Sequence, residues 1–481
     1  MRKPFRPRHG PNAGSWQGDS SRREGALPDQ ANLPRESHNW QSVRETAIRA
    51  YHKWSCNPTR IDAIAERALE RGGWEARDKG LFLELLYGVI RQHGRLNWII
   101  TNLSTSREEP DPAGVAAVAV GIYQLYYLDR VPDFAAVNET VGVAKKLGGP
   151  RLAGWVNAVL RRASFERESW LEAAPPIGRT GPDKTFSIKY SHPDWMVTRW
   201  LSNHPVDVVE RFLIWNNRRP SVTLRVNRLK SSPEEVIASL ERAGLTPHPT
   251  HYDPYFLNID HPGDLRRLPE IKEGLVSVQD LSQGLVARIL DAKPGEEILD
   301  LCAAPGGKTT HLAELAPEAS ITSTDKSEER LDYLRTMISR MGYKNVSVSN
   351  YDIVLSSKRQ YDAVLVDAPC TGTGVLSRRP DLRWRRQPDE VRRMAAVQLS
   401  LLHYAADRLK PGGRIVYSTC SIEPEENRDL IRRFTEDRRD FTTAPISVPL
   451  PEACGVGEKL ELLGPEIGAD GVFATILKRR S

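Results

Sequence analysis

Apolar residues recur three and four positions apart through the first third of the chain, beginning near residue 40. Six segments have this spacing: 42–54, 61–71, 79–103, 113–128, 134–147 and 152–165. Such spacing places the apolar side chains on one face of a helix. Short breakers containing proline and glycine separate the later segments. The pattern predicts an all-α bundle over residues 39–167.

The middle of the chain changes character at a run of prolines and glycines. Residues 175–182 predict a linker, because these residue types interrupt regular structure. Beyond it, residues 221–227 have the composition of a strand. Residues 232–244 have a proline in the first turn and a glycine at the end, as a capped helix does. We therefore predict a small α/β domain over residues 183–275.

The last part of the chain, residues 276–481, alternates short apolar strands with helices. The predicted elements are 297–301, 309–315, 320–324, 328–341, 346–348, 363–366, 391–408, 414–417 and 426–437. Unbroken apolar runs such as 363–366 are typical of strands buried on both faces, which indicates a largely parallel sheet. The fold class is α/β, with a doubly wound, Rossmann-like last domain. Ligands of such sheets bind outside the carboxyl ends of the strands.

Composition limits the classes of protein to consider. The chain has 481 residues, 40% of them hydrophobic, and a net charge of +6, which suits a polyanionic partner. The longest apolar stretch, 114–128, is too short to cross a bilayer, so no membrane association is expected. Residues 1–38 are rich in arginine, proline and glycine and have no secretory apolar segment. They predict a disordered basic arm, either a solvated tail or a weak phosphate binder.

The five cysteines are scattered along the chain without a CxxC pair or a Cys/His cluster at zinc spacing. This distribution argues against a disulfide framework or a structural metal. Free thiols indicate a reducing cytoplasm, where a cysteine can act as a nucleophile.

A glycine-rich turn follows the first strand of the last domain. Residues 301–309 read LCAAPGGKT, and small residues before a helix let the backbone approach a ligand. Asp325 ends the next strand, about 20 residues later, where nucleoside-binding sheets place a carboxylate for ribose hydroxyls. A phosphate-binding loop of an NTPase is disfavoured, because Cys302 stands where that motif requires glycine. These features favour an adenosyl cofactor.

Two further strand ends carry thiols, Cys370 after Asp367 and Cys420 after residues 416–419. Each alone would be read as a buried structural cysteine. The two strands are neighbours in this type of sheet, so both thiols should face one crevice. Near Cys370 stands a cluster expected to grip phosphates and stack on a base, or else to form a solvated face: Arg378, Arg379, Arg383, Trp384, Arg385 and Arg386.

These motifs resemble the signatures of the Sun-type RNA 5-methylcytosine methyltransferases. The likeness rests on residues 301–309, 367–370 and 419–421. It extends to four further stretches: 186–195 (FSIKYSHPDW), 224–227 (LRVN), 278–282 (VQDLS) and 380–386 (PDLRWRR). The helical front resembles the NusB RNA-binding bundle, so the likeness covers nearly everything after Trp40. Residues 464–478 are a weak version of the family's closing hairpin, which leaves strand pairing there open.

The resemblance implies methylation of carbon 5 of a cytosine in small-subunit ribosomal RNA, with S-adenosyl-L-methionine as cofactor. Cys420 would be the nucleophile that adds to carbon 6. Asp367 would bond the cytosine near N3, and Cys370 would assist elimination of the product. Lys308 would orient Asp367 or the methionine part of the cofactor. The implied cofactor site comprises Cys302, Ala303, Ala304, Pro305, Gly306, Gly307, Lys308, Asp325, Asp352 and Asp367.

The expected substrate is an unpaired or flipped cytosine, because carbon 6 is otherwise inaccessible to a thiol. We expect a cytoplasmic monomer that needs no metal. The alternative is a non-catalytic RNA-binding or antitermination factor, suggested by the NusB-like bundle. The two cysteines discriminate between these hypotheses, since a pure binding protein has no need of paired thiols at strand ends.

Overall fold

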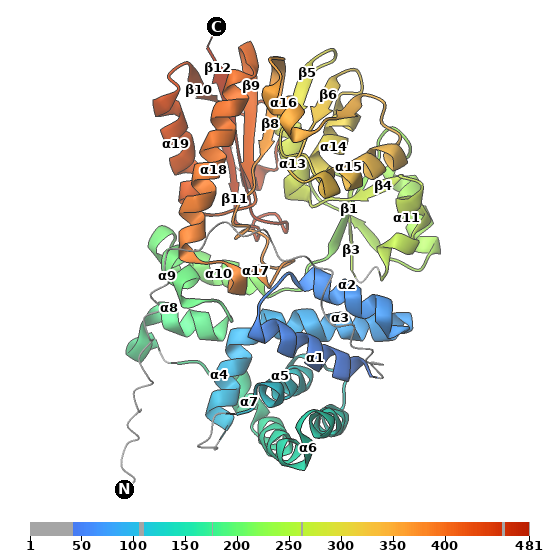
Figure 1. Cartoon of the computed structure of the whole chain (residues 1–481), viewed down its shortest axis with the longest axis vertical. Helices are drawn as coiled ribbons and strands as arrows, with labels where there is room; N and C mark the ends of the chain where they lie inside the picture. Colours follow the sequence, from blue (N-terminus) through green and yellow to red (C-terminus); the bar gives the residue numbers. More distant parts are fainter. Residues whose placement is uncertain (1–41, 105–109, 176, 261–262, 455–456, 481) are drawn as a thin grey trace. The chain divides into compact units, whose positions relative to one another are not determined.

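The bundle predicted for the first third of the chain is present in the computed structural model (Figure 1). The structure describes residues 42–104, 110–175, 177–260, 263–454 and 457–480, and the predicted basic arm lies outside these ranges. The bundle helices are α1 (Val43–Cys56), α2 (Ile61–Gly72), α3 (Ala76–Arg91), α4 (His93–Leu103), α5 (Pro112–Tyr127), α6 (Asp133–Phe165) and α7 (Arg167–Glu172). Helix α5 is buried along most of its length and forms the centre of the bundle core.

Two helix boundaries differ from the prediction. The predicted segment 79–103 is broken at Gln92, whose backbone leaves the helical region between α3 and α4. The predicted segments 134–147 and 152–165 are joined as α6 across a kink at Gly148 and Gly149. Glycine tolerates the backbone angles of the kink, and the following Pro150 suits the first turn of the resumed helix.

Three helices stand where a linker and the start of the small domain were expected. They are α8 (Ile177–Lys189), α9 (Asp194–Asn203) and α10 (Val206–Asn216). The linker prediction was wrong for residues 177–182, because the proline and glycine there form a kink within α8. Pro193 and Pro205 precede α9 and α10 directly, and proline is favoured where helices begin. The buried faces of these helices pack against Leu376, Leu382 and Ile422 of the last domain.

A four-stranded antiparallel sheet forms the small α/β domain. Its strand order is β2-β3-β1-β4, with β1 (Val222–Val226), β2 (Pro247–Pro249), β3 (Phe256–Ile259) and β4 (Val276–Val278). The predicted capped helix is α11 (Pro233–Arg242), whose capping box joins Ser232 and Glu235. The short elements η2 (Leu265–Arg267) and α12 (Pro269–Lys272) lead into β4.

The last domain is a doubly wound sheet of eight strands, which confirms the predicted fold class. Its order is β10-β12-β9-β8-β5-β6-β7, with β11 paired to β12. Strands β5 to β9 run parallel, whereas β12 is antiparallel to β9 and to β10. The strands are β5 (Glu297–Asp300), β6 (Ser320–Ser323), β7 (Val346–Val348), β8 (Tyr361–Asp367), β9 (Leu409–Thr419), β10 (Phe441–Ala444), β11 (Lys459–Leu462) and β12 (Val472–Arg479).

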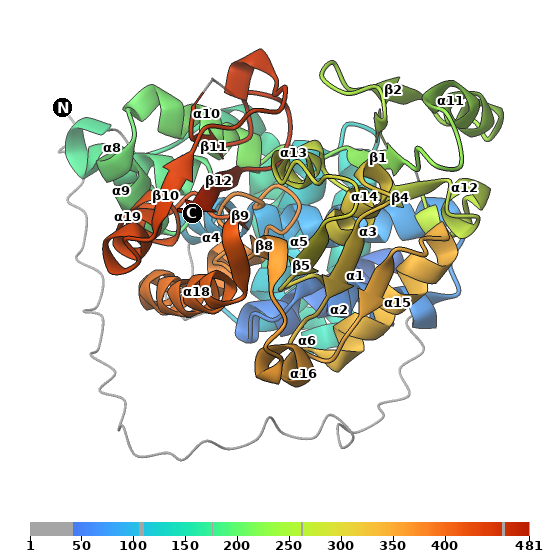
Figure 2. The ribbon, with the colours of Figure 1, turned by 90° about the horizontal axis from the view of Figure 1, so that it is seen from above.

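Helices cover both faces of this sheet, as Figure 2 shows from above. On one face lie α13 (Leu281–Ile289), α14 (Gly307–Leu315) and α15 (Glu328–Met341). On the other lie α16 (Tyr351–Ser356), α18 (Pro388–Asp407) and α19 (Arg428–Asp437). Successive strand residues alternate between the two cores, Ile298 in one and Leu299 in the other, because side chains of a strand point to opposite faces.

The chain's closing hairpin forms despite its weak sequence pattern. Strand β11 pairs with β12 from Lys459 opposite Thr475 to Leu462 opposite Val472. Strands β10 and β11 were absent from the prediction, and each has only four residues. Within the described ranges, no helix has the length and apolar character that a membrane span requires.

Candidate active site

The carboxyl ends of three neighbouring strands meet at one edge of the large sheet. In the sheet register, Asp300 of β5 lies opposite Leu365 of β8, and Asp367 of β8 lies opposite Ser418 of β9. The residues that follow these ends are the glycine turn, Cys370 and Cys420. The topology therefore brings the predicted chemistry to a single edge, as expected for ligand binding in this architecture.

Cys370 and Cys420 are in direct contact. Their Sγ atoms lie 3.2 Å apart, and both side chains are half-buried free thiols. The hydrogen bond to the Cys420 sulfur, together with burial, raises the pKa of Cys370 well above its usual value. Either sulfur can donate to the other in this contact. The contact brings the two predicted thiols together at the strand ends, and the division of roles between them stays a prediction.

Asp367 lies beside the thiols, held by two donors. Lys308 Nζ donates to Asp367 Oδ2 at 2.7 Å, and Ser418 Oγ donates to Oδ1 at 2.8 Å. Lys308 is buried in the first turn of α14 and also donates to Gln283 Oε1. About a third of the Asp367 side chain remains exposed, so its carboxylate stays accessible to a ligand. The predicted contact between Lys308 and Asp367 is present.

The glycine turn adopts a conformation that requires glycine at one position. Gly306 has φ +115°, and a Cβ there would come within 2.5 Å of Leu334. Ala303 and Ala304 are buried before it, whereas Pro305 is exposed. The half-buried Cys302 faces a protein interior that raises its pKa by burial, so it stays a neutral thiol. Helix α14 begins at Gly307, which directs the N–H groups of its first turn toward the strand ends.

Three carboxylates surround this turn. Asp325 is buried, accepts from the Ser327 N–H at 3.0 Å and pairs with Arg330, which also donates to the Ala304 carbonyl. Asp300 accepts from Thr309 Oγ1 at 2.6 Å. Burial, together with the charges of Asp367 and Asp325, raises the pKa of Asp300 to about 7.

This set of residues fits a cationic, adenosyl-bearing ligand. Among the described residues, Asp300 Oδ1 is buried without a hydrogen-bond partner. Carboxylates complement a sulfonium and an ammonium group, and the glycine turn gives close access to its backbone. Asp352 is exposed in the first turn of α16, which follows β7.

The prediction that the arginine cluster binds RNA was wrong for most of its members. Arg383 is fully buried and donates to the carbonyls of Ser191 and Asn216 at 3.0 and 2.9 Å. Trp384 Nε1 donates to the Ile90 carbonyl at 3.0 Å, and its ring packs against the bundle. These side chains join the last domain to the helices before it. Two other members also have partners within the protein. Arg378 pairs with Asp280 and Asp470. Arg386 donates to the carbonyls of Cys370 and Thr371.

Sequence reasoning missed several residues that hold this site. Ser418 and Gln283 contact Asp367 and Lys308, and Glu426 contacts the residues beside both thiols. Glu426 stands among other acidic residues in the run 423–426, so its identity alone gave no signal. Ser418 lies directly before the predicted motif 419–421, and the alternation of side chains along β9 could have indicated it.

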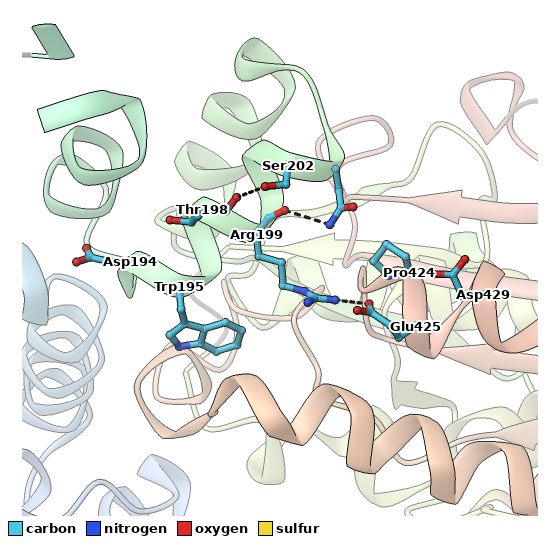
Figure 3. A pocket seen from close by; sticks show the side chains of 9 residues that line it. Asp194, Trp195, Thr198, Arg199, Ser202, Pro424, Glu425 and Asp429 are labelled. Atoms are coloured by element: carbon cyan, nitrogen blue, oxygen red, sulfur yellow. Dashed lines mark hydrogen bonds and ion pairs between the residues drawn. The ribbon is translucent and has the colours of Figure 1, made fainter. Parts of the chain in front are cut away.

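A surface cleft elsewhere contains none of the predicted site residues. It measures about 710 Å³ and lies between α9 and the segment around η3 (Pro424–Glu426), as Figure 3 shows. Arg199, Glu425 and Asp429 line it, and Arg199 is paired with Glu425 and with Glu423. Its charged lining is therefore largely occupied within the protein.

Comparison with known proteins gives three matches to family models. A model described as 16S rRNA methyltransferase RsmB/F matches residues 287–478. A model of the NusB family matches residues 41–165, and a model of the RsmF/B-like ferredoxin-like domain matches residues 192–266.

Individual relatives are similar over most of their length. Ribosomal RNA small subunit methyltransferase B of Salmonella paratyphi B is 38% identical over 409 residues, which cover 84% of this chain and 91% of that protein. The crystal structure of PH0851 is 28% identical, with a TM-score of 0.74, covering 91% of this chain and 98% of that one. The structure of NSun6 from Pyrococcus horikoshii with SFG is 23% identical, with a TM-score of 0.53, and the match covers 59% of this chain and 97% of that one. At this identity the likeness shows the fold alone.

Proposed function

Because the chain belongs to the 16S rRNA methyltransferase RsmB/F family, we propose that it methylates carbon 5 of a cytosine in small-subunit ribosomal RNA through a covalent adduct with Cys420. The family membership confirms the resemblance drawn from the motifs and makes the protein an rRNA methyltransferase. The position of the methyl group and the covalent adduct are our proposal. The observation that carries it is the contact between the two thiols beside Asp367, because methylation without a covalent adduct needs no such pair.

We propose S-adenosyl-L-methionine as the methyl donor. Residues 302–308, with Asp325, Asp352 and Asp367, would hold it, the carboxylates facing its ribose and its cationic groups. When bound, this cofactor supplies a methyl group activated by its sulfonium charge. The ligand SFG in the NSun6 structure is an analogue of this cofactor, which supports the proposal.

Cys420 would add through its thiolate to carbon 6 of the cytosine ring. The electrons of the C5–C6 double bond then make carbon 5 nucleophilic. Asp367, oriented by Lys308 and Ser418, is placed to bond the ring near N3 and to offset the charge that develops there.

Release of the product, once carbon 5 carries the methyl group, requires the proton on carbon 5 to pass to a base, for which we propose a water molecule. Its bonding electrons restore the C5–C6 double bond as the Cys420 sulfur departs as a thiolate. Cys370, 3.2 Å from that sulfur, would assist this elimination. The expected monomeric state and cytoplasmic location stay predictions.

The test uses small-subunit RNA from cells that lack the gene, with S-adenosylmethionine carrying a labelled methyl group. The wild-type protein should transfer label to carbon 5 of a cytosine. Cys420→Ala should abolish transfer, whereas Cys370→Ala should accumulate a protein–RNA adduct that survives denaturing gel electrophoresis. No label with the wild-type protein would favour a non-catalytic RNA-binding role. An adduct with Cys420→Ala instead of Cys370→Ala would reverse the two assignments.

A further inference from the structure

Glu426 is a buried carboxylate whose four hydrogen-bond donors come from the segments that carry the thiols and from α18. Its Oε2 accepts from the Thr371 N–H at 2.9 Å and from Gln398 Nε2 at 2.8 Å. Its Oε1 accepts from Ser421 Oγ at 2.7 Å and from Thr371 Oγ1. Each oxygen therefore takes two donors, which is the full capacity of an ionised carboxylate.

The donors are placed directly beside the thiols in the sequence. Thr371 follows Cys370, and Ser421 follows Cys420. The two segments come from different strands, and the thiols are 50 positions apart in the chain. One carboxylate therefore joins the backbone of one thiol segment to the side chain of the other. Gln398 adds a further connection, because its Nε2 also donates to the Pro369 carbonyl at 2.9 Å.

We infer that Glu426 is a positioning residue that sets the distance between the Cys370 and Cys420 sulfurs. This inference rests on the proposed covalent reaction, in which the spacing of the two thiols governs adduct release. None of the hydrogen bonds of the Glu426 carboxylate described above involves a sulfur, so Glu426 acts through Thr371 and Ser421. A displacement of about 1 Å in such an arrangement can lower a catalytic rate by about 10²-fold.

Glu426→Gln is the sharpest variant, because it keeps the shape of the side chain. An amide group presents one oxygen and one NH₂ group, so its NH₂ group can face the Thr371 and Ser421 hydroxyls only if both hydroxyls reverse from donors to acceptors. The charge-assisted hydrogen bonds to the two thiol segments are thereby weakened while the volume is retained.

Glu423→Gln is the matched control. Glu423 is also fully buried and lies in the same turn of chain. Its carboxylate binds Arg199 and, at 3.0 Å, the indole N–H of Trp200, rather than the residues beside the thiols. A general effect of losing a buried carboxylate should thus be similar in both variants.

Two measurements are needed, the kinetics of methyl transfer and the rate of disulfide formation between Cys370 and Cys420. In the second, diamide oxidises the two thiols to a disulfide and is itself reduced to the hydrazine by taking up both hydrogens. Mass spectrometry after alkylation gives the rate. We expect Glu426→Gln to lower kcat between about 10- and 100-fold with KM for RNA and for S-adenosylmethionine unchanged, and to slow disulfide formation. Glu423→Gln should keep the wild-type disulfide rate.

The outcomes separate this inference from the proposed function. Absence of methylation by the wild-type protein refutes the proposed function, whatever the disulfide rates are. Wild-type kcat and disulfide rate in Glu426→Gln overturn the inference, and so does an equal loss in Glu423→Gln. If Glu426→Gln fails to fold, Ser421→Ala removes the hydrogen bond from the Cys420 segment to the Glu426 carboxylate. Unchanged kcat and disulfide rate in that variant would also overturn the inference.

Discussion

The two halves of the active-site edge are held by different means. On the thiol side, at the ends of β8 and β9, side chains from α18 and from the segment after Cys420 converge on one carboxylate, Glu426. On the cofactor side, after β5, the backbone conformation of Gly306 shapes the turn, and a side chain from another domain braces it. The difference indicates that a substitution can change the cofactor side while leaving the geometry of the thiol pair unchanged, and the reverse.

The brace on the cofactor side is Arg225 of β1. Its guanidinium is fully buried and donates to the Gly307 carbonyl at 2.9 Å, to Thr310 Oγ1 at 3.1 Å and to Glu314 Oε1 at 2.7 Å. It also donates to Gln279. The small α/β domain therefore contacts the first turn of α14 directly. We expect changes in Arg225 to reach the cofactor and to leave the thiol pair as it is.

The largest effect on stability is expected for Arg225→Met. The variant leaves Glu314 buried without its cation, and breaking a buried pair in this way costs about 3–5 kcal/mol. Chemical denaturation should show this loss, and calorimetry with S-adenosylhomocysteine should show weaker binding. The disulfide rate of Cys370 and Cys420 should match that of the wild-type protein, and a slower rate would contradict the separation of the two halves.

Two further variants test the Arg225 effect. Adding Glu314→Gln to Arg225→Met should recover part of the lost stability, because the unpaired charge is removed. Arg211→Met breaks an exposed pair with Asp207 and should cost less than about 1 kcal/mol.

Asp300 gives the cofactor side a pH dependence of stability. Burial raises its folded-state pKa to about 7, above the ordinary value near 3.8. Folding therefore favours the neutral acid. The contribution of Asp300 to the free energy of unfolding is complete below pH 3.8 and is lost as pH rises through 7. The free energy of unfolding of the wild-type protein should fall by about 4 kcal/mol relative to Asp300→Asn between these limits. Denaturation curves of both proteins at several pH values test this, and parallel curves would contradict it.

Sequence alone was informative where the chemistry occupies contiguous residues. The glycine turn and the thiols after β8 and β9 were predicted because each follows an apolar strand, and the alternation of strands and helices implied one common edge. Glu426 and the pair of Arg225 with Glu314 were not predicted. Apart from Ser421, five positions from Glu426, the partners of Glu426 and Arg225 named above lie 28 to 89 positions away in the chain, and no local periodicity marks such contacts. Helix α8 was missed because its kink at Gly181 and Pro182 has the composition of a linker, whereas α9 and α10 lie where the small α/β domain was expected.

For the arginine-rich stretch after Cys370, the sequence predicted a contact with RNA that most of its side chains are not free to make. A run of cations with a tryptophan is typical of an RNA contact, yet burial decides whether those side chains are available. Arg383 and Trp384 bind backbone carbonyls of the preceding helices. The basic composition near the site therefore marks a structural contact between domains.

The smallest expected effect concerns Trp384 and tests whether this side chain is a structural anchor or an RNA contact. Trp384→Phe removes the hydrogen bond to the Ile90 carbonyl and should cost about 1–2 kcal/mol, measured by chemical denaturation. Since the ring packs against the bundle near His93, KM for RNA should stay within about twofold of the wild-type value. A base stacked on an aromatic ring contributes about 1–3 kcal/mol. Trp384→Ala removes the ring as well, and a rise of KM by tenfold or more in that variant, with stability unchanged, would restore Trp384 as an RNA contact and remove its role as an anchor.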